Sequence, residues 1–407
     1  MTGTVVALVV AAAIALAACG AEETRQAPPA PAAPRLLTRS DFADLPGWGG
    51  DRAAEAIRPF LATCTGLARQ PLDRAVGPDG VGGTVADWLG PCRAAMDVGP
   101  GDDAAATRFF EDWFRPYAVG APGGVAADES VGLFTGYYEP ELRGARRPDG
   151  THAVPLYRRP ADLVTVDPGE FGADYQGAGL TGRVVDGRLR PYPTRAEIDS
   201  GALAGRGLEL LWIDDPIDAF FLHIQGSGRV RLADGRVVRV GYAASNGRPF
   251  VGIARLLIDS GAIPRDGASM QAVRDWLRGH PDRAPEMMRA NPRYIFFREF
   301  DGDGPIGAAG VVLTPLRSLA VDPAFLPLGA PLWLDTVWPP GGPDAGTPLR
   351  RLMIAQDTGG AIKGAVRGDI FWGTGEAALA RAGGMKQRGR YFLLLPLSVA
   401  ERRDAAS

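Results

Sequence analysis

Apolar residues recur at helical spacing in the first third of the chain. In the segments 53–67 and 104–117 many of them are three or four positions apart. That spacing places their side chains on one face of an α-helix, where they can pack against a core. We therefore predict that residues 40–118 are mainly helical.

From residue 131 the pattern changes to short apolar runs separated by glycine and proline. Such runs are typical of β-strands joined by turns, and Asp234-Gly235 is a hairpin signal. Roughly six strands after residue 310 fit a small closed barrel, which leaves no exposed strand edge. The predicted strands include 131–140, 218–226, 229–240, 295–299, 311–313, 332–334, 352–355, 369–372 and 391–395, and the predicted helices are 251–259, 270–278 and 377–382.

The composition agrees with a mainly β fold that begins with helices. The chain has 407 residues, and its 55 glycines and 35 prolines favour a loop-rich β architecture. The formal net charge is only −3. Because this charge creates no strong electrostatic field, we expect no nucleic-acid partner.

The N-terminus has the features of an export signal. Residues 5–18 are nearly all apolar, but the run is too short to cross a bilayer. It ends in a lipobox at Cys19, so we expect residues 1–19 to be a lipoprotein signal peptide with the Cys19 thiol lipidated. A plain secretory signal is the alternative. Residues 20–39 are rich in alanine and proline and are predicted to be a flexible linker.

The remaining cysteines and the histidines give no sign of a metal site. Cys64 and Cys92 can form a disulfide in an exported chain, with two free buried thiols as the alternative. The histidines, His152, His223 and His280, are scattered, so we predict no metal. His223 is expected to make a structural hydrogen bond from a strand. The chain carries no phosphate-loop or dinucleotide fingerprint, so we also predict no cofactor.

Two aspartates in the C-terminal third carry the candidate chemistry. An apolar run ends at Asp357, the pair Gly359-Gly360 allows a turn or a positive φ, and Asp369 opens a second apolar run. If that run is extended, Phe371 shares a face with Asp369 and Trp372 lies on the other. Aromatic surface desolvates a carboxyl group and favours its neutral form, as a general acid requires. On spacing alone, two ordinary turn or strand-edge aspartates are the simpler interpretation.

Several motifs in a fixed order resemble a known family. The segment 311–329, the motif Asp357-Thr358-Gly359-Gly360-Ala361-Ile362-Lys363-Gly364 and the pair Gly368-Asp369 resemble the 3D domain, named for its three aspartates. Upstream, the segments 134–140 and 223–228 read FTGYYEP and HIQGSG. With these motifs the chain resembles the membrane-bound lytic murein transglycosylase A family from about residue 133 to residue 395.

This resemblance implies a fold with two domains. The family's catalytic domain is a double-psi β-barrel that is interrupted by an inserted smaller β domain, with a substrate groove between them. Here residues 40–135 and 293–400 would form the barrel with its N-terminal helices. Residues 136–292 would form the insert.

The resemblance also implies the reaction and its main residues. The family cleaves the β-1,4 bond between N-acetylmuramyl and N-acetylglucosamine residues of peptidoglycan and leaves a 1,6-anhydromuramyl product. Asp369 matches the single acid/base, and Asp357 is expected to support it; the reverse assignment is the alternative. Asp322 and Glu376 are nearby acids, and Asp322 is expected to shape a turn before Pro323.

Sugar recognition needs flat apolar faces beside polar groups. Without the family, ordinary turn residues would be the simpler interpretation of the polar candidates. With it, we expect them to line the groove, and Lys363 either to hold Asp357 or to touch a sugar. The predicted substrate-binding residues are Thr135, Tyr137, Tyr138, Gln225, Ser227, Asn246 and Lys363.

Two other functions are compatible with the sequence. One is a non-catalytic, expansin-like barrel that binds glycan, and the other is an inverting glycoside hydrolase, for which Glu139 is the nearest second carboxylate. The expected partner is the peptidoglycan strand, with a monomeric protein attached to the membrane only through its lipid. Because Ala21 follows the lipobox where aspartate would signal retention, resemblance to lipoproteins implies the periplasmic face of the outer membrane.

Overall fold

The computed structural model describes residues 36–120, 130–172, 174, 179–266, 269–302 and 304–405. The predicted signal peptide, the lipidation site Cys19 and residues 20–35 of the predicted linker lie outside these residues. Among the described residues, no helix has both the length and the apolar character needed to cross a membrane.

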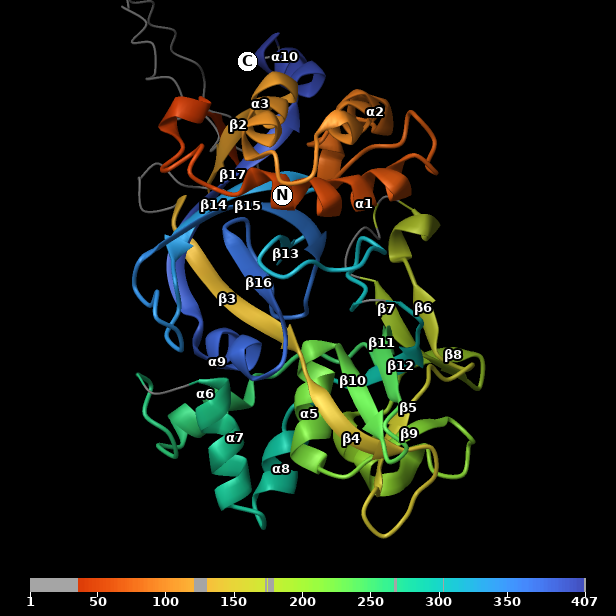
Figure 1. Ribbon diagram of the computed structural model, residues 1–407. Helices are drawn as coiled ribbons and strands as arrows, with labels where there is room; N and C mark the ends of the chain where they lie inside the picture. The colour runs from red at the N-terminus through yellow and green to blue at the C-terminus, as the bar shows by residue number, and fades with distance from the viewer. Residues whose placement is uncertain are drawn as a thin grey trace, which may run out of the picture.

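Six strands close into a ring in the upper half of the molecule (Figure 1). They are β3 (Gly132–Glu139), β13 (Ser318–Ala320), β14 (Pro331–Val337), β15 (Pro348–Asp357), β16 (Arg367–Thr374) and β17 (Lys386–Pro396). The ring closes because β17 pairs with both β14 and β3. A closed ring of six strands agrees with the predicted small barrel. The predicted strand 311–313 is wrong, since Val312 forms only an isolated bridge with Ile306.

Helices cover one end of this barrel, and a two-stranded extension joins them to it. The extension is β1 (Leu37–Arg39) with β2 (Phe114–Val119), and the helices are α1 (Ile57–Leu67), α2 (Val85–Ala94), α3 (Asp103–Trp113) and α10 (Leu397–Ala405). A disulfide between Cys64 and Cys92 joins α1 to α2, with a Cα–Cα distance of 5.6 Å. The helix predicted to reach Tyr117 ends at Trp113, because the next residues pair with β17 as a strand.

The middle of the chain forms a second sheet with helices beside it. Its six strands are β4 (Glu141–Ala145), β5 (Val154–Tyr157), β9 (Glu209–Ile213), β10 (Ser227–Leu232), β11 (Val237–Ser245) and β12 (Ile295–Glu299). The helices are α4 (Arg195–Glu197), α5 (Pro216–Gln225), α6 (Ile253–Asp259), α7 (Met270–Gly279) and α8 (Ala284–Arg289). A three-stranded sheet projects beside them, made of β6 (Val164–Val166), β7 (Leu180–Val185) and β8 (Arg188–Pro191).

The strand predicted at 218–226 is wrong, because these residues belong to helix α5 and its cap. Asp215 caps the helix by accepting hydrogen bonds from the backbone N–H groups of residues 217 and 218. Pro216 occupies the first turn, and Gly226 ends the helix in the left-handed conformation. These are the usual start and stop signals of a helix.

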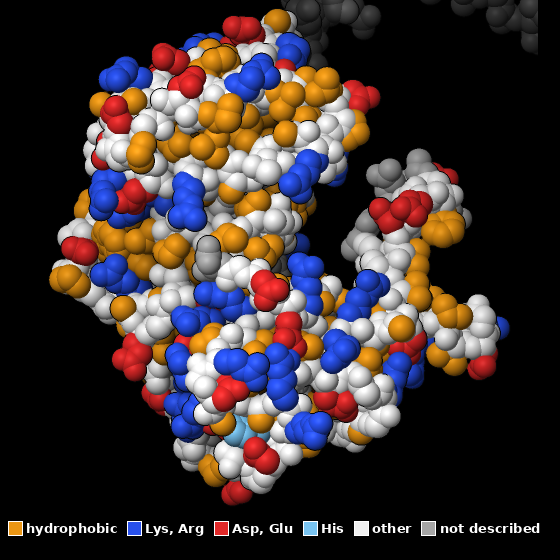
Figure 2. Space-filling view, turned by 45° about the vertical axis from the view of Figure 1, so that its right-hand side comes forward, with side chains coloured by type: hydrophobic (Ala, Val, Ile, Leu, Met, Phe, Trp, Pro, Cys, Tyr) orange, Lys and Arg blue, Asp and Glu red, His pale blue; other side chains and the backbone are white. Residues whose placement is uncertain are grey.

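The chain passes between the two halves of the molecule twice, from β3 to β4 and back from β12 to β13. Strand β3 leaves the barrel and continues through Pro140 into β4 of the second sheet, as the yellow ribbon of Figure 1 shows. Helix α9 (Glu376–Gly384) packs against β3 and β16 at the lower end of the barrel. Figure 2 shows a hollow in the surface between the barrel side and the projecting three-stranded sheet.

Candidate active site

Strand alternation separates a small apolar cluster from the main barrel core. Phe134, Ile370 and Trp372 point into the main core. Their neighbours Tyr137 and Phe371 instead form a second cluster with Leu313, Ala320 and Ile362. Successive side chains of a strand point to opposite faces, so Thr135 and Asp369 share the face of this second cluster. The predicted separation of Phe371 and Trp372 onto opposite faces is thereby confirmed.

One short strand brings the two candidate aspartates onto the same face. Ala320 of β13 is the register partner of Asp369 on the antiparallel strand β16. It is also the partner of Asp357 on the parallel strand β15. Two strand spacings put the Cα atoms of the aspartates about 10 Å apart. Ala320 itself is buried in the second cluster.

Asp369 is half-buried, and a chain of hydrogen bonds holds its carboxyl group. The hydroxyl of Thr135 donates to its Oδ1 at 2.6 Å. Arg367 Nη2 donates in turn to the Thr135 hydroxyl at 2.8 Å. Burial raises the pKa of Asp369 to about 6, although Arg367 and Thr135 pull it down; the charge of Asp357 adds to the rise. About a tenth of Asp369 is therefore protonated at pH 7, far more than of an ordinary aspartate.

Asp357 is held differently, by three hydrogen-bond donors. Its Oδ2 accepts from the Tyr137 hydroxyl at 2.9 Å. Its Oδ1 accepts from the backbone N–H groups of Ala308 at 3.0 Å and Thr358 at 2.9 Å. Burial raises the pKa of Asp357, while these three bonds favour its ionised form. Burial and the Asp357 charge keep the pKa of Tyr137 well above its ordinary value, so the phenol stays a donor.

Gly136, between Thr135 and Tyr137, lets β3 lie against helix α9 and Trp372. A Cβ atom at this position would lie 2.4 Å from Trp372 Nε1 and 2.8 Å from the Cα of Ala382. A residue with a side chain would push β3 away from the helix and displace its neighbours. The absence of a side chain at position 136 therefore helps to fix both site residues beside it.

The glycine pair after Asp357 forms a turn, the first of the two conformations that the sequence allows. Neither Gly359 nor Gly360 has a positive φ; the positive φ, 108°, falls at Gly364. The pair forms a turn in which Ile362 N–H bonds the carbonyl of Gly359 at 3.0 Å. A Cβ atom at Gly360 would lie 3.5 Å from the guanidinium carbon of Arg293. That is an ordinary contact distance, so Arg293 lies beside this turn without requiring a glycine at position 360.

Four of the predicted binding residues lie away from the two aspartates. Tyr138 points into the main core with 4% exposure, and its backbone N–H bonds Gln225 Oε1 at 3.1 Å. Ser227 is half-buried at the start of β10. Asn246 has 0% exposure and bonds backbone groups of the surrounding loops, including Tyr294 N–H at 2.9 Å. In this conformation Asn246 stabilises these loops and does not reach the surface.

Lys363 does not hold Asp357. Its exposed ammonium group lies 3.7 Å from Asp322 Oδ1. Asp322 shapes the turn before Pro323, as predicted, by accepting from Ala324 N–H at 3.2 Å. Its other oxygen accepts from Gly364 N–H at 2.8 Å and so anchors the loop after Asp357. Glu376, the remaining nearby acid, is exposed at the start of α9.

Sequence reasoning missed Arg367, although its position contained a signal. Arg367 is two residues before Asp369 on the same strand and therefore points to the same face. Its Nη1 donates to the carbonyl of Leu133 at 3.3 Å and also to that of Gly368. Backbone bonds thus fix the guanidinium group that touches Thr135. The contact of Ala308 with Asp357 had no comparable signal.

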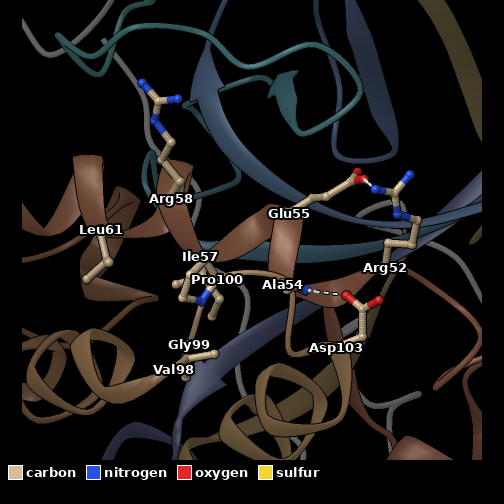
Figure 3. Close-up of a pocket in the computed structure, with 11 residues that line it drawn as sticks. Arg52, Ala54, Glu55, Ile57, Arg58, Leu61, Val98, Gly99, Pro100 and Asp103 are labelled. Atoms are coloured by element: carbon tan, nitrogen blue, oxygen red, sulfur yellow. Dashed lines mark hydrogen bonds and ion pairs between the residues drawn. The ribbon is translucent and has the colours of Figure 1, made fainter.

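Figure 3 shows a separate cavity of about 390 Å³. Neither of the two aspartates lines it. It lies between the start of α1 and the loop before α3. Its acids have partners: Asp103 Oδ1 accepts from Ala54 N–H at 3.0 Å, and Glu55 lies 2.8 Å from Arg52. Because both acids are engaged in these contacts, the cavity offers no better candidate site than the Asp357–Asp369 face.

The described part of the chain contains no cluster of side chains that could hold a metal ion. No group of three histidine, cysteine or acidic side chains gathers among these residues. His223 accepts a hydrogen bond from Ile295 N–H at 3.1 Å, and burial lowers its pKa well below the ordinary value. The predicted structural hydrogen bond of His223 is confirmed, but the residue lies in helix α5 and not in a strand.

Comparison with known proteins identifies two segments of the chain. The MltA specific insert domain matches residues 133–298, and the 3D domain matches residues 317–395. A membrane-bound lytic murein transglycosylase A from Vibrio cholerae is 32% identical over 265 residues. That alignment covers 64% of this chain and 65% of the relative, so it spans somewhat less than two thirds of the relative's length.

Solved structures match nearly the whole chain. A membrane-bound lytic murein transglycosylase from Agrobacterium tumefaciens superposes with a TM-score of 0.78 and 35% identity, covering 90% of this chain and 99% of that one. Escherichia coli MltA with bound chitohexaose gives a TM-score of 0.62 and 26% identity, covering 89% and 95%. Since the insert, the 3D domain and the complete fold all agree, this chain belongs to the membrane-bound lytic murein transglycosylase A family.

Proposed function

We propose that this protein is a lytic transglycosylase of peptidoglycan with Asp369 as its single acid/base. It would cleave the β-1,4 bond between N-acetylmuramyl and N-acetylglucosamine residues. The observation that carries the assignment is the environment of Asp369, whose pKa is raised by burial to about 6. At this pKa the group can give a proton and take one back near neutral pH.

In the first step the Asp369 carboxyl proton moves to the glycosidic oxygen. The bond between C1 of the muramyl residue and that oxygen breaks, and C1 gains oxocarbenium character. The N-acetyl group of the substrate can stabilise this centre, as in substrate-assisted glycosidases. In the second step the Asp369 carboxylate takes the proton of the C6 hydroxyl, whose oxygen bonds C1. The product is a 1,6-anhydromuramyl end, and Asp369 is protonated again.

Asp357 fits the role of a fixed negative charge in this scheme. Three donors favour its carboxylate, and the Tyr137 phenol remains protonated beside it. A carboxylate on the same face as Asp369 opposes ionisation of Asp369 and attracts positive charge at C1. The reverse assignment is less favourable, because a general acid must hold a proton and three donors stabilise the ionised form of Asp357.

An inverting hydrolase would need a second carboxylate that can activate water. Glu139, the sequence candidate, has 0% exposure, and both of its oxygens accept from Arg239 Nη1, at 3.0 and 3.1 Å. Burial raises the pKa of Glu139 while Arg239 lowers it. Because this carboxyl is enclosed in an ion pair, it has no access to a water molecule in the groove. These contacts favour the transglycosylase.

Mass spectrometry of murein digests tests the proposal. Purified sacculi are incubated with the mature protein in detergent and with its Asp369→Asn variant. Anhydro-muropeptides from the wild type alone support the assignment, whereas anhydro products from both proteins would transfer the acid to Asp357. Reducing ends would indicate a hydrolase. Retention on sacculi without any release would indicate a glycan-binding barrel.

We further propose the attachment and domain arrangement that the sequence implies. A lipid on Cys19 would hold a monomer at the periplasmic face of the outer membrane, with residues 136–292 inserted into a double-psi barrel. The family name, membrane-bound, supports attachment. Labelling of the wild type but not of Cys19→Ala with a radioactive fatty acid tests the anchor, and membrane fractionation tests its location.

A further inference from the structure

Four arginines form a row from the projecting three-stranded sheet to the loop after Asp357. Arg183 on β7 and Arg190 on β8 are direct register partners. The guanidinium carbon of Arg183 lies 6.0 Å from the ring centre of Tyr192, and Arg248 Nε donates to the Tyr192 carbonyl at 2.9 Å. We call Arg183, Arg190, Arg248 and Arg293 the arginine row.

The row ends beside the candidate active site. Arg293 Nη1 points to the carbonyl of Arg248 at 3.5 Å. Its guanidinium carbon would lie 3.5 Å from a Cβ at Gly360, three residues after Asp357. The loop carrying Arg248 packs on β7, since a Cβ at Gly247 would meet the Thr181 side chain at 2.6 Å. A ligand on the Asp357–Asp369 face could therefore extend along the row.

The charges of the row lack carboxylate partners within the described residues. No Asp or Glu oxygen of these residues lies within 4.0 Å of the four guanidinium groups. Arg183 Nε is buried and has no hydrogen-bond partner among them. Glu197 lies in the field of Arg183 and Arg248, but Thr194 already bonds one of its oxygens through its N–H and hydroxyl, at 2.6 and 2.7 Å.

This arrangement costs stability unless an anion is bound. Like charges directly opposite each other on neighbouring strands repel. Arg190 is exposed and Arg183 is half-buried, so both can reach a ligand. Figure 2 shows Lys and Arg side chains beside the hollow near the projecting sheet. Guanidinium groups bind carboxylates in paired hydrogen bonds, so the row suits a ligand with several carboxylates.

We propose that the arginine row binds the carboxylates of the peptide stems on the murein strand. This inference rests on the proposed function, because it takes the glycan bound at Asp369 to be peptidoglycan. Each muramyl residue of that polymer can carry a peptide with free carboxylates on its lactyl group. A strand on the Asp357–Asp369 face would present such a stem toward Arg293 and Arg248, and the next toward Arg183 and Arg190.

The double variant Arg183→Gln/Arg190→Gln tests the row without touching the aspartates. Its kcat/KM for anhydro release is measured on intact sacculi and on the same glycan after an amidase has removed the stems. We expect a loss of about three- to tenfold on intact sacculi, reduced by salt, and none on stem-free glycan. The matched control is Arg236→Gln/Arg255→Gln, whose side chains are 72% and 87% exposed.

Equal losses on both substrates, or no loss on either, would overturn the inference. The amidase leaves a lactyl carboxylate on the glycan, so equal losses would assign the row to that group or to the sugars. A melting temperature at or above that of the wild type excludes misfolding, because the variant removes a repulsion. If the wild type releases anhydro ends from neither substrate, the proposed function fails. Pelleting with intact and stem-free sacculi then tests the row alone: selective loss of retention on intact sacculi supports it, and equal retention refutes it.

Discussion

Replacement of Arg367 by glutamine should move the pH dependence of catalysis to higher pH. In the proposed mechanism the free enzyme must hold a proton on Asp369, so kcat/KM falls as pH rises through the pKa of about 6. Arg367 stabilises the Asp369 carboxylate and lowers this pKa. Without the guanidinium charge the pKa rises, and the basic limb of the profile should follow it.

The geometry sets the size of this effect. Two hydrogen bonds of 2.8 and 2.6 Å link Arg367 Nη2 to Asp369 through the Thr135 hydroxyl. The sum of the two distances limits the separation of the charged atoms to about 5.4 Å. At this separation and an effective dielectric constant of 20, the attraction between the two charges is about 3 kcal/mol. One pH unit corresponds to about 1.4 kcal/mol, and both groups retain some solvent screening. We therefore expect the limb to move by about one pH unit.

Initial rates of anhydro-muropeptide release, measured as kcat/KM across the pH range, test this expectation. Arg367→Lys keeps the charge and should leave the limb close to that of the wild type. Arg350→Gln on strand β15 is the matched control, because its guanidinium pairs with Asp335 at 2.9 Å. A limb that stays in place or moves to lower pH in a folded Arg367→Gln protein would refute the reasoning.

Three further changes have expected outcomes. Asp369→Asn should abolish anhydro release yet stabilise the fold by about 3 kcal/mol near neutral pH, because the raised pKa of the carboxyl costs stability that grows between pH 3.8 and about 6. This gain, measured by thermal unfolding, should vanish below pH 3.8. Gly136→Ala should destabilise the protein by about 2 kcal/mol or more, because its Cβ would lie 2.4 Å from Trp372 Nε1; an unchanged melting temperature would contradict this. Replacement of Cys64 and Cys92 by alanine should lower the free energy of unfolding in denaturant by about 2–4 kcal/mol without changing kcat; a change in kcat alone would contradict it.

Local patterns in the sequence predicted the parts of the fold that depend on neighbouring residues. Side chains alternate between the two faces of a strand, so Asp369 and Phe371 were predicted to lie on the face opposite Trp372. The structure confirms that Phe371 and Trp372 belong to different clusters. The same rule would have found Arg367, which is two positions from Asp369. The helix α5 was misread because a continuous apolar run fits a buried strand as well as a buried helix. Its cap at Asp215-Pro216 and its end at Gly226 were the deciding signals.

Contacts between distant parts of the chain were beyond the sequence. Tyr137 and Asp357 are 220 positions apart in the sequence. No local pattern predicts the hydrogen bond between them. The same limit applies to Arg293, whose approach to Gly360 depends on how the second sheet meets the barrel. Asn246 lies in a turn-like sequence, but its four hydrogen bonds to surrounding backbone groups bury it completely. Only the folded chain distinguishes such a structural amide from one that lines a groove.

The different environments of the two aspartates have a common origin in strand β3. Thr135 and Tyr137 are two positions apart and face the same side, so one reaches Asp369 and the other Asp357. The hydroxyl of Thr135 gives Asp369 one donor, whereas Tyr137 adds a third to Asp357. A carboxyl with fewer donors keeps its proton to higher pH, so this difference favours Asp369 as the acid of the proposed mechanism. Beyond Glu139 the same strand enters the second sheet, so a displacement of that sheet would alter the site directly.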